Sequence, residues 1–357
     1  MREFPEWRQN SKSMKMNALD AKIGQLREYL SSGEKRIAVL THTNPDGDAI
    51  GSSLAWAAVL RSMGHTVNCL VPNRYPNFLA WMPGIADVII AKEANEKAER
   101  VVDEADIIFC LDFNRIDRLE NLSTHIVNNS KAVRILIDHH LDPPLEEYAL
   151  AFSDHTSCST SYLVYRIAER LTGVEVFDRE AAEALYVGIM TDTGNFSFSY
   201  LTPGLFRAVA DLIEKGIDVP SINSRVYNAY SEGRMRLLGY VLLQKMQLIE
   251  NNRIAYIGLQ EHELRRFDFQ IGDSEGFVNY PLSVTSVQMS AMFLETRKFI
   301  RISFRSKGNV DVSEFAARYF GGGGHKNASG GKSFEPMDKT IENFKKAVAE
   351  YFKEKQL

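Results

Sequence analysis

Short, mainly apolar segments constrain the fold of this chain more than any other feature. Arg36–Leu40 is followed by similar runs at Thr66–Val71, 106–111 and 133–137. Between the first two runs, the residues after Gly47 carry apolar side chains at helical spacing. Such runs suit a parallel sheet that is covered on both faces. The alternation therefore predicts an α/β fold with a doubly wound, mostly parallel sheet.

Polar clusters follow three of these strands, and a fourth cluster follows a helical stretch at 179–190. Ligands of open α/β sheets bind outside the carboxyl ends of the strands, so these clusters should converge in space. In chain order, the clusters contain His42, Asp46, Asp48, Asp112, Asp138, His139, His140 and Asp192.

The residue types in these clusters indicate cation binding. Closely spaced carboxylates repel one another unless cations neutralise them. Carboxylate and imidazole ligands without a thiolate suit Mn²⁺ or Mg²⁺ better than structural zinc. The pattern predicts a hydrolase that uses two divalent cations.

Each cluster also has a structural interpretation. The Asn-Pro-Asp-Gly sequence before Asp48 favours a turn, and Asp48 could cap the helix that follows. Asp112 could be a solvated strand end, and Asp192 could belong to a turn. The adjacent His139 and His140 are harder to explain in this way.

The second half predicts a different domain. The segment 221–249 reads as one long helix, with a domain junction near 230–234. Strands are expected at 253–259, 286–294 and 298–305, and helices at Val312–Phe320 and 337–352. We therefore predict an N-terminal extension (1–19), a metal-binding domain (20–220), a helical linker (221–249) and a smaller α/β substrate-binding domain (250–357).

Two features of the smaller domain suggest anion recognition. Gly323 and Gly324 belong to a run of four glycines that His325 follows, and Ser329 lies in a second stretch of small residues. Glycines let backbone N–H groups approach an anion closely, although such a run can also be a flexible linker. On the strand before it, Arg301 and Arg305 share one face, and their guanidinium groups suit phosphate or base recognition. Alternation of this kind also occurs on any half-exposed strand.

Composition excludes several classes of protein. The net charge of −4 argues against a protein that grips long duplex nucleic acid through a basic face. The three cysteines are widely separated and should be reduced thiols. We find neither an apolar signal core nor a segment as long as a membrane span, so we expect a cytoplasmic protein without membrane contact.

These motifs together resemble the DHH phosphoesterases, which are named for a triplet like Asp138-His139-His140, in the branch with a C-terminal DHHA1 domain. The resemblance covers roughly residues 20–350, and the four N-terminal motifs occur in family order. The size of the chain is similar to that of the nanoRNase/pAp phosphatase group, which is often labelled exopolyphosphatase-related.

The resemblance also implies a role for each site residue. One Mn²⁺ would be held by His42, Asp46, Asp112 and Asp192. The other would be held by Asp48, Asp112, His139 and Asp192, so that Asp112 bridges the two. His140 would contact the scissile phosphate or the leaving group, and Asp138 would support it. Substrate would be held by Arg305, His325, Gly323, Gly324, Ser329, Arg301 and Arg118.

The implied activity is the hydrolysis of short oligoribonucleotides and 3′-phosphoadenosine 5′-phosphate. Two other hydrolases share this metal site, namely a polyphosphate or pyrophosphate hydrolase and a single-strand exonuclease of the RecJ kind. A nucleotide sensor without catalysis is the alternative from a different class. The sequence does not decide whether Mn²⁺ or the alternative, Mg²⁺, is the physiological metal. It also does not decide whether the protein forms a homodimer.

Overall fold

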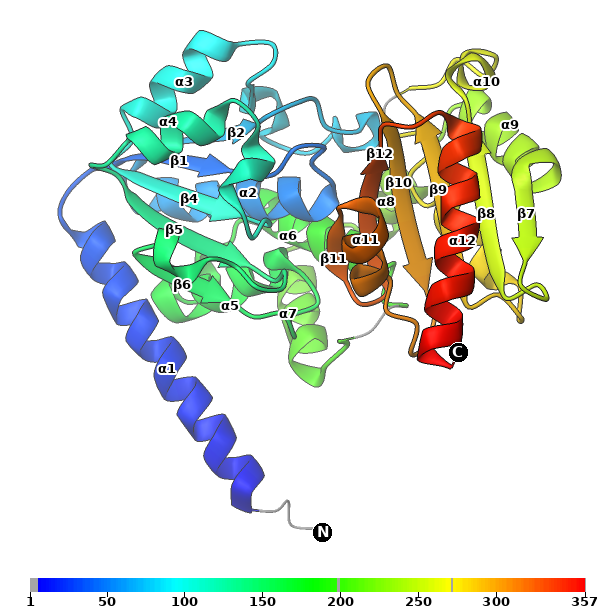
Figure 1. Cartoon of the computed structure of the whole chain (residues 1–357). Helices are drawn as coiled ribbons and strands as arrows, with labels where there is room; N and C mark the ends of the chain where they lie inside the picture. Colours follow the sequence, from blue (N-terminus) through cyan, green and yellow to red (C-terminus); the bar gives the residue numbers. More distant parts are fainter. Residues whose placement is uncertain (1–5, 198–199, 271, 357) are drawn as a thin grey trace. The chain divides into compact units, whose positions relative to one another are not determined.

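The computed structural model describes the backbone of residues 6–197, 200–270 and 272–356, and side chains from residue 19 onward. The chain forms two compact units that divide between Asn228 and Ala229 (Figure 1). Each unit is built on its own six-stranded sheet. Both sheets carry helices, so the fold is α/β as predicted.

The sheet of the first unit is entirely parallel and has the strand order β3-β2-β1-β4-β5-β6. The order reverses between β1 and β4, so the carboxyl ends of these neighbours flank a topological switch point, where ligands of such sheets bind. The strands are β1 (Arg36–Leu40), β2 (Thr66–Val71), β3 (Ile89–Ile90), β4 (Ile107–Leu111), β5 (Val133–Asp138) and β6 (Leu150–Ser153).

Successive residues of a strand point to opposite faces of the sheet, so apolar strands present apolar side chains on both faces. Helices cover both of these faces. Ile37 and Val39 of β1 pack into one core, whereas Ala38 and Leu40 pack into the other. This arrangement confirms the doubly wound sheet. The helices of the unit are α1 (Glu6–Ser31), α2 (Gly47–Ser62), α3 (Asn95–Asp103), α4 (Leu122–Asn128), α5 (Thr160–Thr172), α6 (Arg179–Asp192), α7 (Pro203–Glu214) and α8 (Val219–Tyr227).

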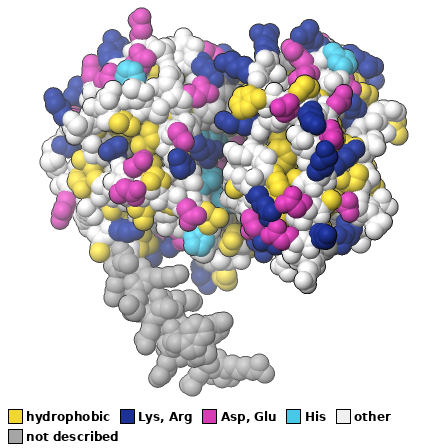
Figure 2. Space-filling view, viewed as in Figure 1, with side chains coloured by type: hydrophobic (Ala, Val, Ile, Leu, Met, Phe, Trp, Pro, Cys, Tyr) yellow, Lys and Arg dark blue, Asp and Glu magenta, His cyan; other side chains and the backbone are white. Residues whose placement is uncertain are grey.

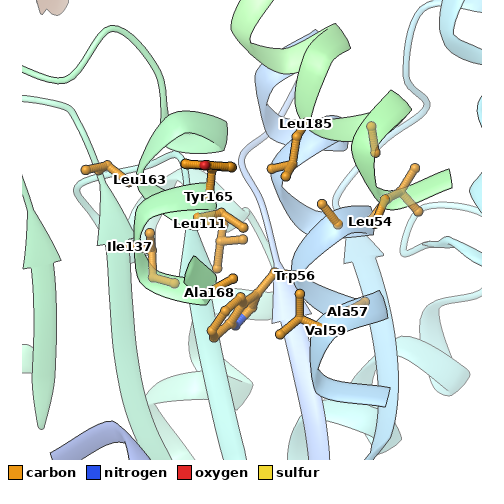
Figure 3. Close-up of a cluster of buried hydrophobic side chains, with 14 of the residues drawn as sticks. Leu54, Trp56, Ala57, Val59, Leu111, Ile137, Leu163, Tyr165, Ala168 and Leu185 are labelled. Carbon is orange, nitrogen blue, oxygen red and sulfur yellow. The ribbon is translucent and has the colours of Figure 1, made fainter. Parts of the chain in front are cut away.

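The larger core joins α2, α5 and α6 to the sheet (Figure 3). Leu111 of β4 and Ile137 of β5 lie in this core beside Trp56 of α2 and Ala168 of α5. Both strand residues immediately precede predicted site residues and are fully buried. Packing therefore fixes the ends of the two strands that carry the site.

The second unit has a mixed sheet with the order β11-β12-β10-β9-β8-β7. Of its neighbouring strands, only β8 and β9 run parallel. The strands are β7 (Met246–Ile249), β8 (Ile254–Leu259), β9 (Met289–Glu295), β10 (Ile300–Ser306), β11 (Gly323–His325) and β12 (Ala328–Ser333). The helices are α9 (Glu232–Tyr240), α10 (Glu261–Arg265), α11 (Val312–Phe320) and α12 (Met337–Lys355).

The predicted alternation of β10 is confirmed. Ile300, Ile302 and Phe304 are buried in the core against α11 and α12, and Arg301 and Arg305 point to the other face. An aromatic cluster around Phe304, Phe315 and Phe344 fills this core, with ring centroids 5.4 to 6.2 Å apart.

The segment 221–249 is not one long helix, which corrects our expectation. Helix α8 ends at Tyr227, and α9 begins at Glu232 after a short break. A π-helical turn, Val241–Lys245, then leads into β7, so the last four residues of the segment form a strand. At the other end of the chain, α1 runs across the expected boundary between residues 19 and 20.

No helix among the described residues is long and apolar enough to span a membrane. The three cysteines are unpaired, as predicted, and all three are buried. Burial raises the pKa of each thiol to about 12, well above the range of reactive cysteines.

Candidate metal centre

All the residues predicted to bind metal lie in the first unit, at the carboxyl edge of its sheet. His42 follows β1, Asp112 follows β4, and His139 follows β5, so three neighbouring strands each place a side chain there. Asp46 and Asp48 come from the start of α2, and Asp192 is the last residue of α6.

The predicted metal ligands form two groups of donor atoms that share Asp112, and Asp112 also belongs to a third group with Asp138 and His140. One group contains His42, Asp46 and Asp112, and the other contains Asp48, Asp112 and His139. Within each group the donor atoms lie within 4.8 Å of one another. Each group thus offers one imidazole and two carboxylates.

The two oxygens of Asp112 face different groups. Its Oδ2 lies 3.4 Å from Nε2 of His42, and its Oδ1 lies 3.4 Å from Nε2 of His139. The same His139 nitrogen lies 3.3 Å from Oδ2 of Asp192. Two donors that bind one cation at about 2.1 Å and at right angles are about 3 Å apart, so these separations suit shared ligation.

Both imidazoles point the same nitrogen at the carboxylates. Nδ1 of His42 contacts the carbonyl oxygen of Thr43 at 2.9 Å, and Nδ1 of His139 contacts that of Ser157 at 3.3 Å. A carbonyl can only accept a hydrogen bond, so each Nδ1 carries a proton. The Nε2 atoms then offer a lone pair to a cation, as in metal-binding histidines.

Backbone N–H groups hold the two carboxylates of α2. Oδ1 of Asp46 accepts from the N–H groups of Asp48 and Ala49, both at 3.0 Å, so Asp46 is the N-cap of α2. This corrects the alternative in which Asp48 caps the helix. Asp48 lies in the first turn and is buried, and the N–H groups of Thr160 and Ser161 on α5 donate to it.

Asp138 orients His140. Its Oδ1 lies 2.7 Å from Nδ1 of His140, and its Oδ2 accepts from the His140 N–H at 3.1 Å. Asp138 is fully buried, whereas His140 is partly exposed. A carboxylate accepts this hydrogen bond, so Nδ1 of His140 carries a proton.

Asp112 has a strained backbone. Its φ of +63° lies in the left-handed region, which costs a residue with a side chain about 1–3 kcal/mol. Its N–H donates to the carbonyl of Ile137, so pairing with β5 holds this conformation. Strain of this kind is frequent at functional sites.

The centre is short of positive charge. Burial, together with the Asp112 and Asp192 carboxylates, holds the pKa of Asp48 well above its usual value. Burial alone would also raise the pKa of Asp112, but hydrogen bonds with His139 and His42 outweigh it and hold that pKa well below its usual value. Burial would lower the pKa of His139, but the carboxylates of Asp192, Asp112 and Asp48 raise it well above its usual value.

These observations fit divalent cations. In the absence of a cation, a proton on His139 supplies part of the charge that the carboxylates require. The donor atoms are oxygen and imidazole nitrogen, and the side chains are held in place by the surrounding backbone. The described residues can therefore hold one cation in each group, with Asp112 between them.

The raised pKa of His139 predicts an unusual pH dependence in chelator. Its proton stabilises the fold fully below its unfolded pKa of about 6.5, and this contribution is lost as pH rises through the folded pKa. We therefore expect the melting temperature of the chelated protein to fall above pH 6.5, as thermal melts between pH 6 and 9 would show.

Saturating Mn²⁺ should reverse this trend, because a metal-binding imidazole must be neutral. The control is His139→Gln, which should lose most of the slope in chelator. Equal slopes for the variant and the wild type would show that another group titrates.

Two of the predicted substrate-binding residues share a face of the second sheet. Arg305 lies opposite Ala328 on β12, and Ala328 lies opposite His325 on β11. Directly opposed residues of antiparallel strands point to the same face, so Arg305 and His325 flank a small side chain. The guanidinium donates one hydrogen bond, at 2.9 Å, to the Phe304 carbonyl.

Half of the glycine run is a strand, whereas the sequence also allowed a flexible linker. Gly323 and Gly324 belong to the edge strand β11, and Gly321 ends α11 with a φ of +56°. A Cβ atom at Gly324 would lie 2.6 Å from the Ala328 carbonyl oxygen. The hydroxyl of Ser329 is buried and donates to the Val312 carbonyl at 2.5 Å, so Ser329 holds β12 against α11.

The remaining two arginines are held in different ways. Arg301 is half-buried, and its Nη2 donates to Ser274 at 3.3 Å. Arg118 lies in the 3-10 turn Ile116–Leu119, where its carbonyl accepts from the Thr43 N–H at 3.0 Å. Arg118 is thereby tied to the loop that carries His42.

Sequence reasoning missed the start of α5. The N–H groups of Thr160 and Ser161, together with the Thr160 hydroxyl, contact Asp48 and Asp112. A run of Ser and Thr residues before an apolar helix is the signal of an N-terminal cap, and residues 156–161 contain one. That signal locates the helix start but does not show which side chains it meets.

Comparison with known proteins places this architecture in a family. A model described as the DHH family, N-terminal domain, matches residues 36–189, and a DHHA1 domain model matches residues 253–354. The crystal structure of an exopolyphosphatase-related protein from Bacteroides fragilis is 40% identical, with a TM-score of 0.87, over 93% of this chain and 96% of that one. This chain belongs to the DHH family.

Curated relatives of this DHH protein carry functional names. The bifunctional oligoribonuclease and PAP phosphatase NrnA of Thermus thermophilus is 28% identical over 92% of this chain and 94% of its own length. The protein of the same name from Bacillus subtilis is 26% identical over 87% and 94%. The DHH model includes His42, Asp46, Asp48, Asp112, His139 and His140 but ends before Asp192.

Proposed function

We propose that this protein is a phosphoesterase that uses two divalent cations, most readily Mn²⁺, to hydrolyse short oligoribonucleotides and 3′-phosphoadenosine 5′-phosphate. The observation that carries the proposal is the sharing of Asp112 between two groups of donors. The names of the curated relatives support the substrate class. Localisation in the cytoplasm remains a prediction.

The contacts of the side chains support the following roles. When bound, the two cations would supply Lewis-acid stabilisation of phosphoryl oxygens and a lowered pKa for a bound water. His42, Asp46 and Asp112 would hold one of them, and Asp48, Asp112 and His139, joined by Asp192, the other. Asp138 holds His140 so that its Nε2 can contact the scissile phosphate or the leaving oxygen.

We assign recognition of the rest of the nucleotide to the second unit. Arg305 and His325 present a guanidinium and an imidazole on one face of its sheet. A guanidinium fits a phosphate in two-point contact, and a phosphate is present in both proposed substrates. Arg301 on the same strand and Arg118 in the first unit are weaker candidates for this role.

Arg305→Ala should raise KM for nucleotide substrates much more than it lowers kcat. Losing a hydrogen bond to a charged group costs about 1.5–3 kcal/mol, roughly 10- to 150-fold in affinity. A residue that supplies binding alone changes KM and leaves kcat nearly unchanged.

Steady-state kinetics with 3′-phosphoadenosine 5′-phosphate would measure both constants. Arg297→Ala removes an exposed arginine between β9 and β10 and is the matched control. A fall in kcat at unchanged KM would place Arg305 in the chemical step instead.

The substrate class is tested by comparing kcat/KM, with Mn²⁺ and at one salt concentration, for four substrates. These are 3′-phosphoadenosine 5′-phosphate, a diribonucleotide, a 24-nucleotide RNA and polyphosphate. We expect the first two substrates to have the highest kcat/KM. The chain carries a net charge of −4, and acidic and basic side chains are mixed over the face seen in Figure 2.

The other outcomes identify the alternatives. A rate that rises with RNA length would favour an exonuclease of the RecJ kind. Preference for polyphosphate would favour a polyphosphate hydrolase, an activity related to the one in the name of the Bacteroides protein. Binding without turnover of any substrate would favour a nucleotide sensor.

A further inference from the structure

Helix α5 begins directly against the candidate metal centre. The N–H of Thr160 donates to Oδ2 of Asp48 at 2.6 Å, and the N–H of Ser161 donates to Oδ1 of the same carboxylate at 2.8 Å. The hydroxyl of Thr160 donates to Oδ1 of Asp112 at 3.0 Å. Thr160 is fully buried, so these contacts are shielded from water.

We propose that Thr160 is a positioning residue for the cation in the group of Asp48, Asp112 and His139. This inference rests on the cation site of the proposed function. One residue contacts both carboxylates of the group, through its N–H and through its hydroxyl. It therefore sets the distance between two ligands that arrive from α2 and from the end of β4.

The packing around α5 keeps this contact in place. Ser159 caps the helix by accepting from the Tyr162 N–H at 3.0 Å. Ala168 on the same helix packs in the large core (Figure 3). On α6, a Cβ atom at Gly188 would lie only 2.8 Å from Oδ1 of Asp48, so this glycine leaves room for the carboxylate.

The hydrogen bond of Thr160 also directs Asp112. It occupies Oδ1, the oxygen that faces His139. The donor is present before any cation arrives, because it belongs to a packed helix. Partners of this kind orient a ligand, and removing one typically weakens metal affinity by about 10- to 100-fold.

The test is Mn²⁺ binding to metal-free protein, measured by isothermal titration calorimetry. Thr160→Val keeps the shape and the backbone N–H but removes the hydroxyl, and we expect one of the two binding events to weaken by about 10- to 100-fold. Thr160→Ser keeps a hydroxyl and should bind nearly as the wild type does. Thr160→Ala removes the same hydroxyl with less bulk, in case the valine variant does not fold.

Thr172→Val is the matched control. It removes a hydroxyl from the far end of the same helix, where that hydroxyl donates to the Ala168 carbonyl at 3.0 Å, and it should leave Mn²⁺ affinity unchanged. Wild-type affinity in the valine and alanine variants at Thr160 would overturn the proposal, as would an equal loss of affinity in Thr172→Val. If the wild type itself bound no Mn²⁺, the proposed function would fail first.

Discussion

Asp112→Asn is expected to reduce turnover more than any other single substitution in this protein. Asparagine keeps the shape of the side chain but replaces one carboxylate oxygen by an N–H₂ group, which repels a cation. Because Asp112 belongs to both groups of donors, the change affects both cations. Loss of a single electrostatic contact in an active site costs about 100- to 1,000-fold in kcat, so we expect a loss of at least about 1,000-fold.

The measurement is kcat/KM with 3′-phosphoadenosine 5′-phosphate, together with the number of Mn²⁺ ions bound by the purified variant. Asp117→Asn provides the control, since Asp117 is an exposed aspartate in the turn that follows Asp112. Activity within about tenfold of the wild type in Asp112→Asn would exclude the bridging role, because loss of one electrostatic contact alone costs more than that.

Mn²⁺ should stabilise the first unit and leave the second nearly unchanged. All the proposed ligands lie in the unit that ends at Asn228. A ligand at 100 times its dissociation constant stabilises the folded state by about 2.7 kcal/mol. For a unit of this size, that corresponds to an increase of about 5–10 °C in melting temperature.

Differential scanning calorimetry in chelator and in Mn²⁺ would separate the two units if they melt independently. The double variant Asp46→Asn, Asp48→Asn removes one ligand from each group and should lose the increase. An equal increase in both transitions would show that the cation binds elsewhere.

The sequence predicted four of the six strands of the first sheet closely, for a physical reason, but it did not predict the short edge strands β3 and β6. Strands β1, β4 and β5 are buried on both faces, so each is a run of apolar residues with sharp ends. The polar residues that follow them can only lie at the edge of the sheet. The convergence of His42, Asp112 and His139 was therefore predictable from strand order alone.

The sequence did not predict the helix breaks near the domain division. Apolar spacing resumes late in α9 and continues into β7, and periodicity alone does not separate a helix end from a short strand. The structure of the glycine run was difficult to predict for a similar reason. Glycine is permissive in loops, but Gly324 is required here because β12 lies too close for a side chain.

The sequence also did not predict the long-range polar contacts. Thr160 meets Asp48 and Asp112 only because α2, α5 and the end of β4 are packed together in three dimensions. Likewise, the N-cap of α2 is Asp46 rather than Asp48, and both residues suit a cap by type. Spacing identifies candidates for such roles, and tertiary packing decides among them.

The order of the ligands along the chain has a consequence for folding kinetics. The proposed ligands run from position 42 to position 192 and come from three strands and two helices. They come together only when these strands and helices are packed, so we expect the cations to bind after the folding transition state. Interactions that form after that state slow unfolding and leave the folding rate almost unchanged. In this protein the cations should therefore lengthen the lifetime of the folded state rather than speed its formation.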